Sequence, residues 1–366
     1  MHLVPNMYSV KYFLNISRPV FRHTKLNKNI SNYYRSNCTF KQCNWPTLLR
    51  KSEFDNGRYQ SNNKQYNKFL LGGILFSIFE IFYDKKEEDN PTSELITTIK
   101  RSILLIKKNK YIEAEQMLHV ALRQAQTLQN YDGITYVYDV MANLAFDREE
   151  YSKAEKLFVS VMQRIMEKGA KQDDMRLIHM SLKLAKLFEK QGDIQKAEQG
   201  YQYCFQHLNS KIVSLPDDDV IALLGMTSEW YAGFLLSQSK YQEALKYYNE
   251  AYNLCIQLNG EQDIQTIYLL NNLGTVCYLL KDYPLAQQYF IKAAKLGHTM
   301  KDIEEEGLIH VNLGYVNMKL GLFEDAFKEC KYGLRLSELT HEDDVTQKAK
   351  DCLEDLKKLT DNLNTS

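Results

Sequence analysis

One pattern of apolar positions recurs six times between residues 111 and 333 of this 366-residue chain. An aromatic or aliphatic residue is followed by alanine three positions on, an apolar residue four later and a small residue three after that. The copies are Tyr111/Ala114/Leu118/Ala121, Tyr151/Ala154/Phe158/Val161, Ile194/Ala197/Tyr201/Cys204, Tyr241/Ala244/Tyr248/Ala251, Tyr283/Ala286/Phe290/Ala293 and Phe323/Ala326/Cys330/Gly333. These offsets lie on one stripe of an α-helix. The pattern therefore predicts six helices that pack through a core of Ala114, Ala154, Ala197, Ala244, Ala286 and Ala326.

A second amphipathic helix precedes each copy and carries a small residue where the paired helices would cross. These small residues are Ser102, Ala142, Ala185, Ala232, Gly274 and Gly314. After the last copy, residues 345–359 again show helical spacing and would cover the final pair, whose apolar face would otherwise be exposed. The pattern predicts an all-α solenoid of about six helix pairs with a C-terminal capping helix.

The repeat unit resembles the tetratricopeptide repeat (TPR), whose helix pairs stack into a right-handed solenoid. The spacing between successive anchor alanines is 40, 43, 47, 42 and 40 residues. A standard unit is about 34 residues long. Longer helices or loops are therefore expected, similar to the kinesin light chain type, and the repeat domain is expected over residues 94–362.

Charge divides the chain into a basic leader and an acidic body. Residues 1–68 hold twelve Lys or Arg but only Glu53 and Asp55, which leaves 34 basic and 44 acidic residues for the remainder. A basic, acid-poor leader is typical of a mitochondrial transit peptide. The alternative is a disordered basic arm that touches nucleic acid or lipid. The acidic body argues against a nucleic-acid partner.

The only continuous apolar run is 69–83, which precedes a short linker at 84–93. Fifteen helical residues rise about 22 Å, less than the ~30 Å hydrocarbon core. The run is a candidate membrane segment, and Lys64 and Lys68 on its N-terminal side would stay in the matrix. The repeat domain would then face the intermembrane space. The alternatives are a monotopic or packed helix, or a piece removed with the leader.

Several stretches resemble a mitochondrial branch of the TPR family: Ile134–Phe146, Lys171–Asp174, Ser181–Ala185, Asn259–Glu261 and Gln265–Ile267. The resemblance covers roughly residues 94–360. It implies an inner-membrane protein that associates with respiratory complex III and helps to clear fragments of its Rieske iron–sulfur subunit. The subunits of complex III, in particular the Rieske protein or its fragments, are the partners that the resemblance implies.

In a solenoid of this type the first helix of each pair lines the inner surface. Counting from the anchor alanines places several polar or aromatic residues on or near that surface. They form the candidate peptide groove: Asn143, Lys183, Tyr268, Asn271, Asn272, Asn312 and Tyr315. An asparagine amide can read a peptide backbone because it both donates and accepts. The alternative is an amide that bonds to solvent or a neighbouring side chain. Trp230 lies near this surface but fits a packing role better.

No catalytic motif accompanies these positions. The sequence has no HExxH, no GxSxG and no GxxxxGK[ST], so we expect no enzyme, metal, cofactor or small-molecule substrate. The five cysteines outside the leader show no ligand spacing and are expected as buried thiols. Two rival functions stay open: a cytosolic cargo adaptor similar to kinesin light chain, and a peptidase that acts on Rieske fragments.

Overall fold

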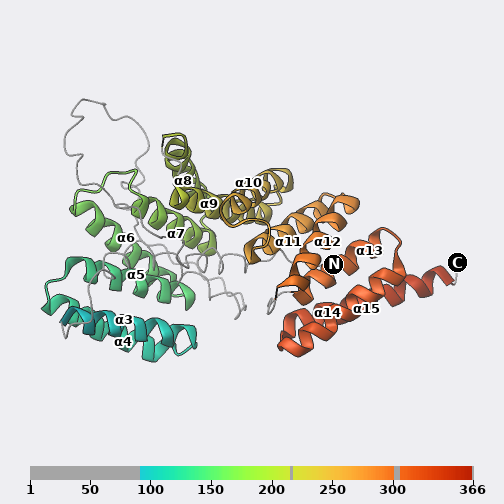
Figure 1. The fold of residues 1–366 in the computed structure, drawn as a ribbon, viewed down its shortest axis with the longest axis horizontal. Coiled ribbons are helices and arrows are strands. Elements are labelled where there is room, and N and C mark those ends of the chain that lie inside the picture. Colours follow the sequence, from blue (N-terminus) through green and yellow to red (C-terminus); the bar gives the residue numbers. More distant parts are fainter. Residues whose placement is uncertain (1–90, 215–216, 301–305, 365–366) are drawn as a thin grey trace. The chain divides into compact units, whose positions relative to one another are not determined.

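The computed structural model describes residues 91–214, 217–300 and 306–364, and within these ranges it contains thirteen α-helices and no strand (Figure 1). The helices are α3 (Pro91–Lys107), α4 (Tyr111–Thr127), α5 (Tyr131–Asp147), α6 (Tyr151–Glu167), α7 (Met175–Gln191), α8 (Ile194–Ser214), α9 (Asp218–Ser237), α10 (Tyr241–Asn259), α11 (Ile264–Leu279), α12 (Tyr283–Thr299), α13 (Glu306–Lys319), α14 (Phe323–Thr340) and α15 (Asp343–Asn364). Helices of 14 to 22 residues account for the long repeat period.

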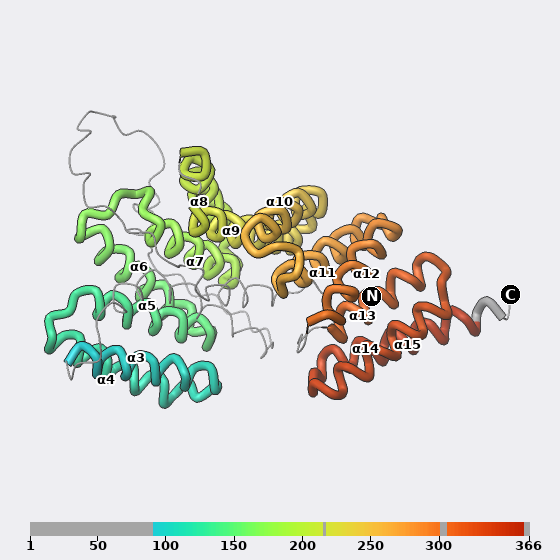
Figure 2. Tube along the Cα trace, viewed as in Figure 1, coloured from blue at the N-terminus to red at the C-terminus, as the bar shows by residue number. Residues whose placement is uncertain are grey.

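The helices form antiparallel pairs in chain order, as Figure 2 shows for the successive hairpins. Five pairs are in direct contact as α3–α4, α5–α6, α9–α10, α11–α12 and α13–α14. In the sixth pair, Tyr201 on α8 donates its hydroxyl to the Glu189 carboxylate on α7 at 2.6 Å. The last helix, α15, packs against α13 and α14. The predicted all-α solenoid of about six pairs with a capping helix is confirmed.

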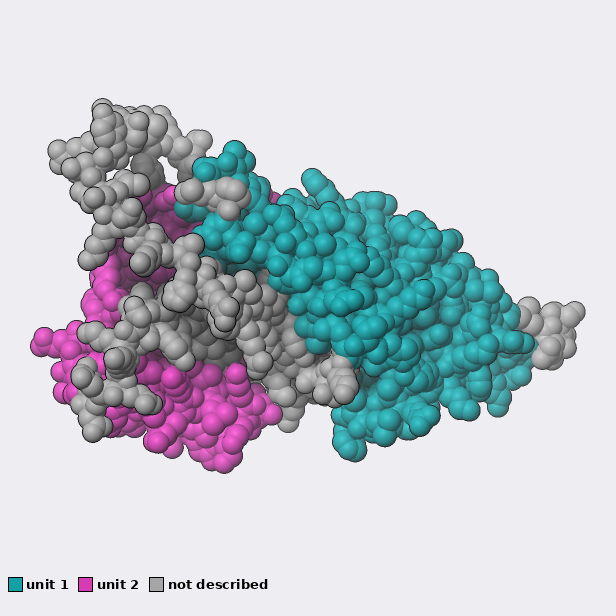
Figure 3. Space-filling model, viewed as in Figure 1, with its two compact units in different colours: residues 1–13, 204–366 teal, residues 14–203 magenta. Residues whose placement is uncertain are grey.

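The chain divides into two compact units within α8 (Figure 3). Among the described residues, 91–203 belong to the unit that we call the N-terminal unit, and 204–364 belong to the C-terminal unit. The predicted leader 1–68 and the apolar run 69–83 lie outside the described residues. Helix α3 begins at Pro91, so the last three residues assigned to the linker 84–93 are helical.

The six anchor alanines all lie fully buried in the core, each with 0% of its surface exposed: Ala114, Ala154, Ala197, Ala244, Ala286 and Ala326. Large rings fill the space beside them, and Phe158, Tyr201 and Phe290 are likewise 0% exposed. A methyl side chain lets the paired helix approach closely, while the ring one turn away supplies most of the buried apolar area. Anchor alanines thus pack beside a larger side chain one turn away, which is an aromatic ring in four of the six copies.

Every turn within a pair has the same backbone form. One residue, five positions before the anchor alanine, adopts a left-handed conformation: Asn109, Glu149, Gly192, Ser239, Lys281 and Gly321. The next residue donates its N–H to the carbonyl five positions earlier, as Lys110 does to Leu105 at 2.9 Å. This bond closes the end of the first helix in the manner of a Schellman motif. Glycine, which suits this conformation best, occupies only two of the six turns.

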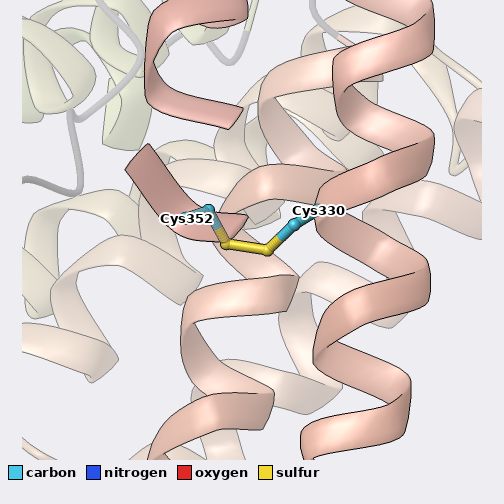
Figure 4. The surroundings of a disulfide bond; sticks show 2 residues. All are labelled: Cys330 and Cys352. Atoms are coloured by element: carbon cyan, nitrogen blue, oxygen red, sulfur yellow. A yellow bond between two sulfur atoms is a disulfide. The ribbon is translucent and has the colours of Figure 1, made fainter. Parts of the chain in front are cut away.

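A disulfide joins Cys330 on α14 to Cys352 on α15, with the two Cα atoms 6.1 Å apart (Figure 4). The expectation of buried thiols is therefore wrong for this pair, although Cys204, Cys255 and Cys277 are buried and free. Local sequence patterns could not indicate this bond because the two residues lie 22 positions apart on separate helices. The bond fastens the capping helix to the last repeat.

Gly314 on α13 makes room for this disulfide, and we expect Gly314→Ala to destabilise the C-terminal unit. A Cβ atom at this position would lie 2.3 Å from the Cys330 Sγ and 3.2 Å from the Cys352 Sγ. Overpacking of a filled core costs about 1–3 kcal/mol, against which alanine gains up to about 1 kcal/mol in helix propensity. The free energy of unfolding from urea titration should fall by about 1–2 kcal/mol.

The matched control is Gly233→Ala in α9, where an added Cβ would meet only the Tyr248 hydroxyl at an ordinary 3.5 Å. That variant should be neutral, or more stable by up to about 1 kcal/mol. Equal stability of the two variants would show that the space beside the disulfide is not tightly filled.

Candidate protein-binding face

Capping residues fix where the first helix of several pairs begins, and so which residues reach its inner face. Asn130 accepts the Gly133 N–H at the start of α5, and Asp174 accepts the Arg176 N–H at the start of α7. Asp263 accepts the Gln265 N–H at 2.8 Å at the start of α11. Each cap satisfies a backbone donor that the helix itself leaves open. The register of the polar residues farther along each helix follows from these starting points.

The N-terminal polar cluster consists of Tyr136, Asp139 and Asn143 on α5 with Lys183 on α7. The Asp139 Oδ1 accepts from the Asn143 Nδ2 at 3.2 Å and from the Lys183 Nζ at 3.3 Å. The side chains of Asp139 and Lys183 are only 2% and 1% exposed, so this is a buried ion pair. The Lys183 Nζ also lies 5.7 Å above the ring of Phe158.

Burial governs the ionisation of this cluster. It raises the pKa of Asp139, and the nearby Lys183 ammonium opposes that rise. Burial likewise lowers the pKa of Lys183, which the Asp139 carboxylate opposes. The pKa of Tyr136 is raised, first by burial and then by the charge of Asp139. The charged form of each residue is thus stabilised mainly by the opposite charge of its partner, because burial removes the water that would otherwise solvate it.

The C-terminal polar cluster consists of Glu229 on α9, Gln265 and Asn271 on α11, and Asn312 on α13. Gln265 donates its Nε2 to the Glu229 carboxylate at 2.8 Å. The Asn312 Nδ2 donates to the Asn271 Oδ1 at 3.0 Å. These bonds join the first helices of neighbouring pairs. Unlike the N-terminal cluster, this one is built mainly from neutral amides, which both donate and accept.

The structure buries all seven residues of the candidate groove. Their exposed fractions are 3% for Asn143, 1% for Lys183, 0% for Tyr268, 0% for Asn271, 1% for Asn272, 1% for Asn312 and 5% for Tyr315. It brings Asn143 and Lys183 together on Asp139, and Asn271 and Asn312 together on each other. Trp230, on α9, is 4% exposed and belongs to the hydrophobic core. Tyr268, Asn272 and Tyr315 take part in none of these bonds.

Sequence reasoning missed Asp139, Glu229 and Gln265, which complete the two clusters. Asp139 lies one helical turn before Asn143, and Glu229 lies three positions before the crossing residue Ala232. An acid at such a position on an otherwise apolar helix is a signal that could have found both. The pairing of Gln265 with Glu229 could not have been found this way because it depends on how two helices are packed.

Two further features of the described residues bear on function. They contain no group of three or more His, Cys, Asp or Glu side chains placed to hold a metal ion. One described helix, α9, is long and apolar enough to span a bilayer, but 83% of its most apolar window is buried inside the protein. Packing in the repeat core accounts for its composition.

Comparison with known proteins shows which class of helical-repeat protein has this fold. The family model for the tetratricopeptide repeat matches residues 223–296, which span α9 to α12. The crystal structure of BtubC from P. vanneervenii is similar, with a TM-score of 0.54 and 22% identity over 64% of this chain and 92% of that one. The TPR-sensor STAND protein PH0952 from Pyrococcus horikoshii also has a TM-score of 0.54, at 14% identity over 74% of this chain and 38% of that one. The protein is a tetratricopeptide-repeat scaffold.

Curated relatives narrow the class to one family. The tetratricopeptide repeat protein 19 homolog, mitochondrial, of Drosophila melanogaster is 39% identical over 275 residues, 75% of this chain and 74% of that protein. Tetratricopeptide repeat protein 19, mitochondrial, of Homo sapiens is 31% identical over 74% of both chains. The chain belongs to the mitochondrial tetratricopeptide repeat protein 19 family.

Proposed function

We propose that this protein is a non-enzymatic scaffold at the mitochondrial inner membrane that supports respiratory complex III. It acts by gripping complex III subunits, in particular the Rieske protein or its fragments, and by aiding the clearance of those fragments. The observation that carries the proposal is the 39% identity over 275 residues to a relative named as mitochondrial. The resemblance of residues 94–360 to that family supplies the partner.

The packing of the repeat domain supports a binding role. Stacked helix pairs present an extended face that can accommodate a peptide segment. In the C-terminal unit, the Asn271 Nδ2 and the Gln265 Oε1 are buried and have no hydrogen-bond partner among the residues that the structure describes. A side-chain amide with an unused donor or acceptor can bond to a peptide backbone. The seven groove residues therefore stay our candidates for the peptide contact.

The distribution of charge and hydropathy supports the location. The basic leader 1–68 would direct import, and the apolar run 69–83 would attach the chain to the inner membrane. The positively charged flank before that run would stay in the matrix, so that the repeat domain faces the intermembrane space. Complex III lies in the same membrane, so the scaffold and its partner would share one surface.

The test is affinity capture of the tagged full-length chain from solubilised mitochondria, with a tagged unrelated inner-membrane protein as control. We expect complex III subunits in the captured fraction, and accumulation of Rieske fragments in cells that lack the protein. Absence of both results would contradict the proposal. A fusion of residues 1–68 to a fluorescent protein should reach mitochondria, whereas a diffuse signal would favour the cytosolic cargo adaptor.

A further inference from the structure

The N-terminal polar cluster contains three buried polar atoms that lack a hydrogen-bond partner among the described residues. The Asp139 Oδ2, the Asn143 Oδ1 and the Tyr136 hydroxyl are all buried and have no hydrogen-bond partner among the described residues. The three residues are 2%, 3% and 4% exposed. Buried polar atoms are almost always paired, so two unpaired acceptor oxygens and a hydroxyl that can donate or accept indicate a missing partner rich in donors.

The position of Lys183 explains why it does not supply them. Its Nζ contacts the Asp139 Oδ1 at 3.3 Å, and the Asn143 Nδ2 shares that same oxygen at 3.2 Å. The second carboxylate oxygen is left without a donor. A further acid, Asp147, is 2% exposed and its charge also acts on Lys183. The Lys183 ammonium thus interacts with two carboxylates, and it leaves the second oxygen of Asp139 open to a further donor.

The three acceptors lie along one side of α5. Residues 136, 139 and 143 are separated by three and four positions, so they share a stripe about 10 Å long. This stripe belongs to the first helix of its pair, which lines the inner surface of a helical-repeat solenoid. The three residues are buried, so a partner's side chain would have to insert between the helices to reach the unpaired atoms.

We propose that Tyr136, Asp139 and Asn143 form a recognition site for an arginine side chain of an extended peptide partner. The inference rests on the proposed scaffold function and deepens it by naming the chemistry of the segment that is gripped. A guanidinium group presents five N–H donors in one plane, enough for all three acceptors. It is also more weakly hydrated than a lysine ammonium, which lowers the penalty of burying it.

The C-terminal polar cluster sharpens this assignment. Its unpaired atoms include one donor, the Asn271 Nδ2, and one acceptor, the Gln265 Oε1. This combination suits a peptide backbone of any sequence. The N-terminal cluster differs because its unpaired atoms include the carboxylate Oδ2 of Asp139 together with the amide Oδ1 of Asn143, so we assign recognition of a cationic side chain to the N-terminal unit.

The experiment measures how the full-length chain binds peptides with and without arginine. An array of 15-residue peptides tiles the complex III subunits, and a second array tiles unrelated mitochondrial proteins. Each peptide is printed in its native form, with arginine replaced by lysine, and with arginine replaced by glutamine. The strongest binders are then titrated in solution by fluorescence anisotropy. For the wild-type chain, we expect replacement by glutamine to weaken binding about tenfold or more, and replacement by lysine to weaken it less.

Three variants locate the effect. In Asp139→Asn, exchange of arginine for glutamine in the peptide should change the affinity by less than about twofold, because the variant lacks the carboxylate that attracts the guanidinium group. Tyr136→Phe removes a hydroxyl that has no partner among the described residues, so it should fold normally and bind the arginine peptide about threefold more weakly. Asp132→Asn removes a carboxylate that pairs with Lys168 at the surface of α5, and it should bind like the wild type.

The outcomes separate this inference from the proposed function. Arginine-dependent binding confined to unrelated peptides would keep the site and overturn the complex III assignment. Binding of complex III peptides that ignores the arginine exchange would overturn the site and keep the scaffold function. If Asp139→Asn does not fold, Tyr136→Phe decides: an arginine dependence as strong as in the wild type overturns the site.

Discussion

Replacement of Lys183 by methionine is expected to lower the free energy of unfolding of the N-terminal unit by about 3–5 kcal/mol. The change keeps most of the length and volume of the side chain but removes the ammonium from a 3.3 Å ion pair. Asp139, only 2% exposed, is then left as a buried carboxylate without a cation. Urea unfolding followed by circular dichroism measures the loss, and hydrogen exchange should show that it is centred on α5 and α7.

The pH dependence of the same variant provides an independent check. Burial already raises the pKa of Asp139, and loss of the ammonium raises it further. A carboxyl whose pKa is higher in the folded than in the unfolded state stabilises the fold at low pH, and this contribution disappears as the pH rises through the folded pKa. The defect of Lys183→Met should therefore shrink on acidification towards the unfolded pKa of about 4.

The double variant Asp139→Leu/Lys183→Met is the control. Replacing both members of a buried ion pair with apolar groups is often neutral or even stabilising, because no charge is left to desolvate. We expect this variant to recover most of the stability and to lose the extra pH dependence. If the double variant is as unstable as Lys183→Met at every pH, the defect comes from packing rather than from the unpaired carboxylate.

Removal of the Cys330–Cys352 disulfide is expected to cost the C-terminal unit about 3 kcal/mol, the loss of chain entropy for closing a loop of this size. The bond holds α15 against the last repeat (Figure 4). Both half-cystines are 0% exposed, so the folded protein should resist reducing agent until the cap opens. The Cys330→Ala/Cys352→Ala variant should show early exchange of amide hydrogens in α15 and a lower midpoint of unfolding.

Reductant provides the matched comparison. Wild-type protein unfolded in the presence of a strong thiol reductant should approach the double variant, whereas the double variant itself should not respond. Cys277→Ala, which removes a buried free thiol from α11, controls for the loss of a sulfur atom from the core. A wild-type midpoint that is equal with and without reductant in fully equilibrated samples would contradict the prediction.

The sequence by itself determined the helix pairs, their order, the capping helix and the core alanines. These follow from local periodicity, because residues three and four positions apart on a helix share a face whatever surrounds them. The 3–4–3 spacing around Ala286, for example, places Tyr283 and Phe290 on one stripe without any knowledge of the partner helix. Family membership was also within reach, since the 134–146 block is distinctive.

Only the tertiary structure decided which polar residues meet. Lys183 reaches Asp139 from 44 positions away, and Asn312 reaches Asn271 from 41. Contacts of this kind depend on the rotation and offset of one helix against the next. The anchor spacing varies between 40 and 47 residues, so the register cannot be carried from one pair to another. The same holds for Cys330 and Cys352. The packing of α15 on α14 brings the two sulfur atoms together, and no local sequence pattern predicts that contact.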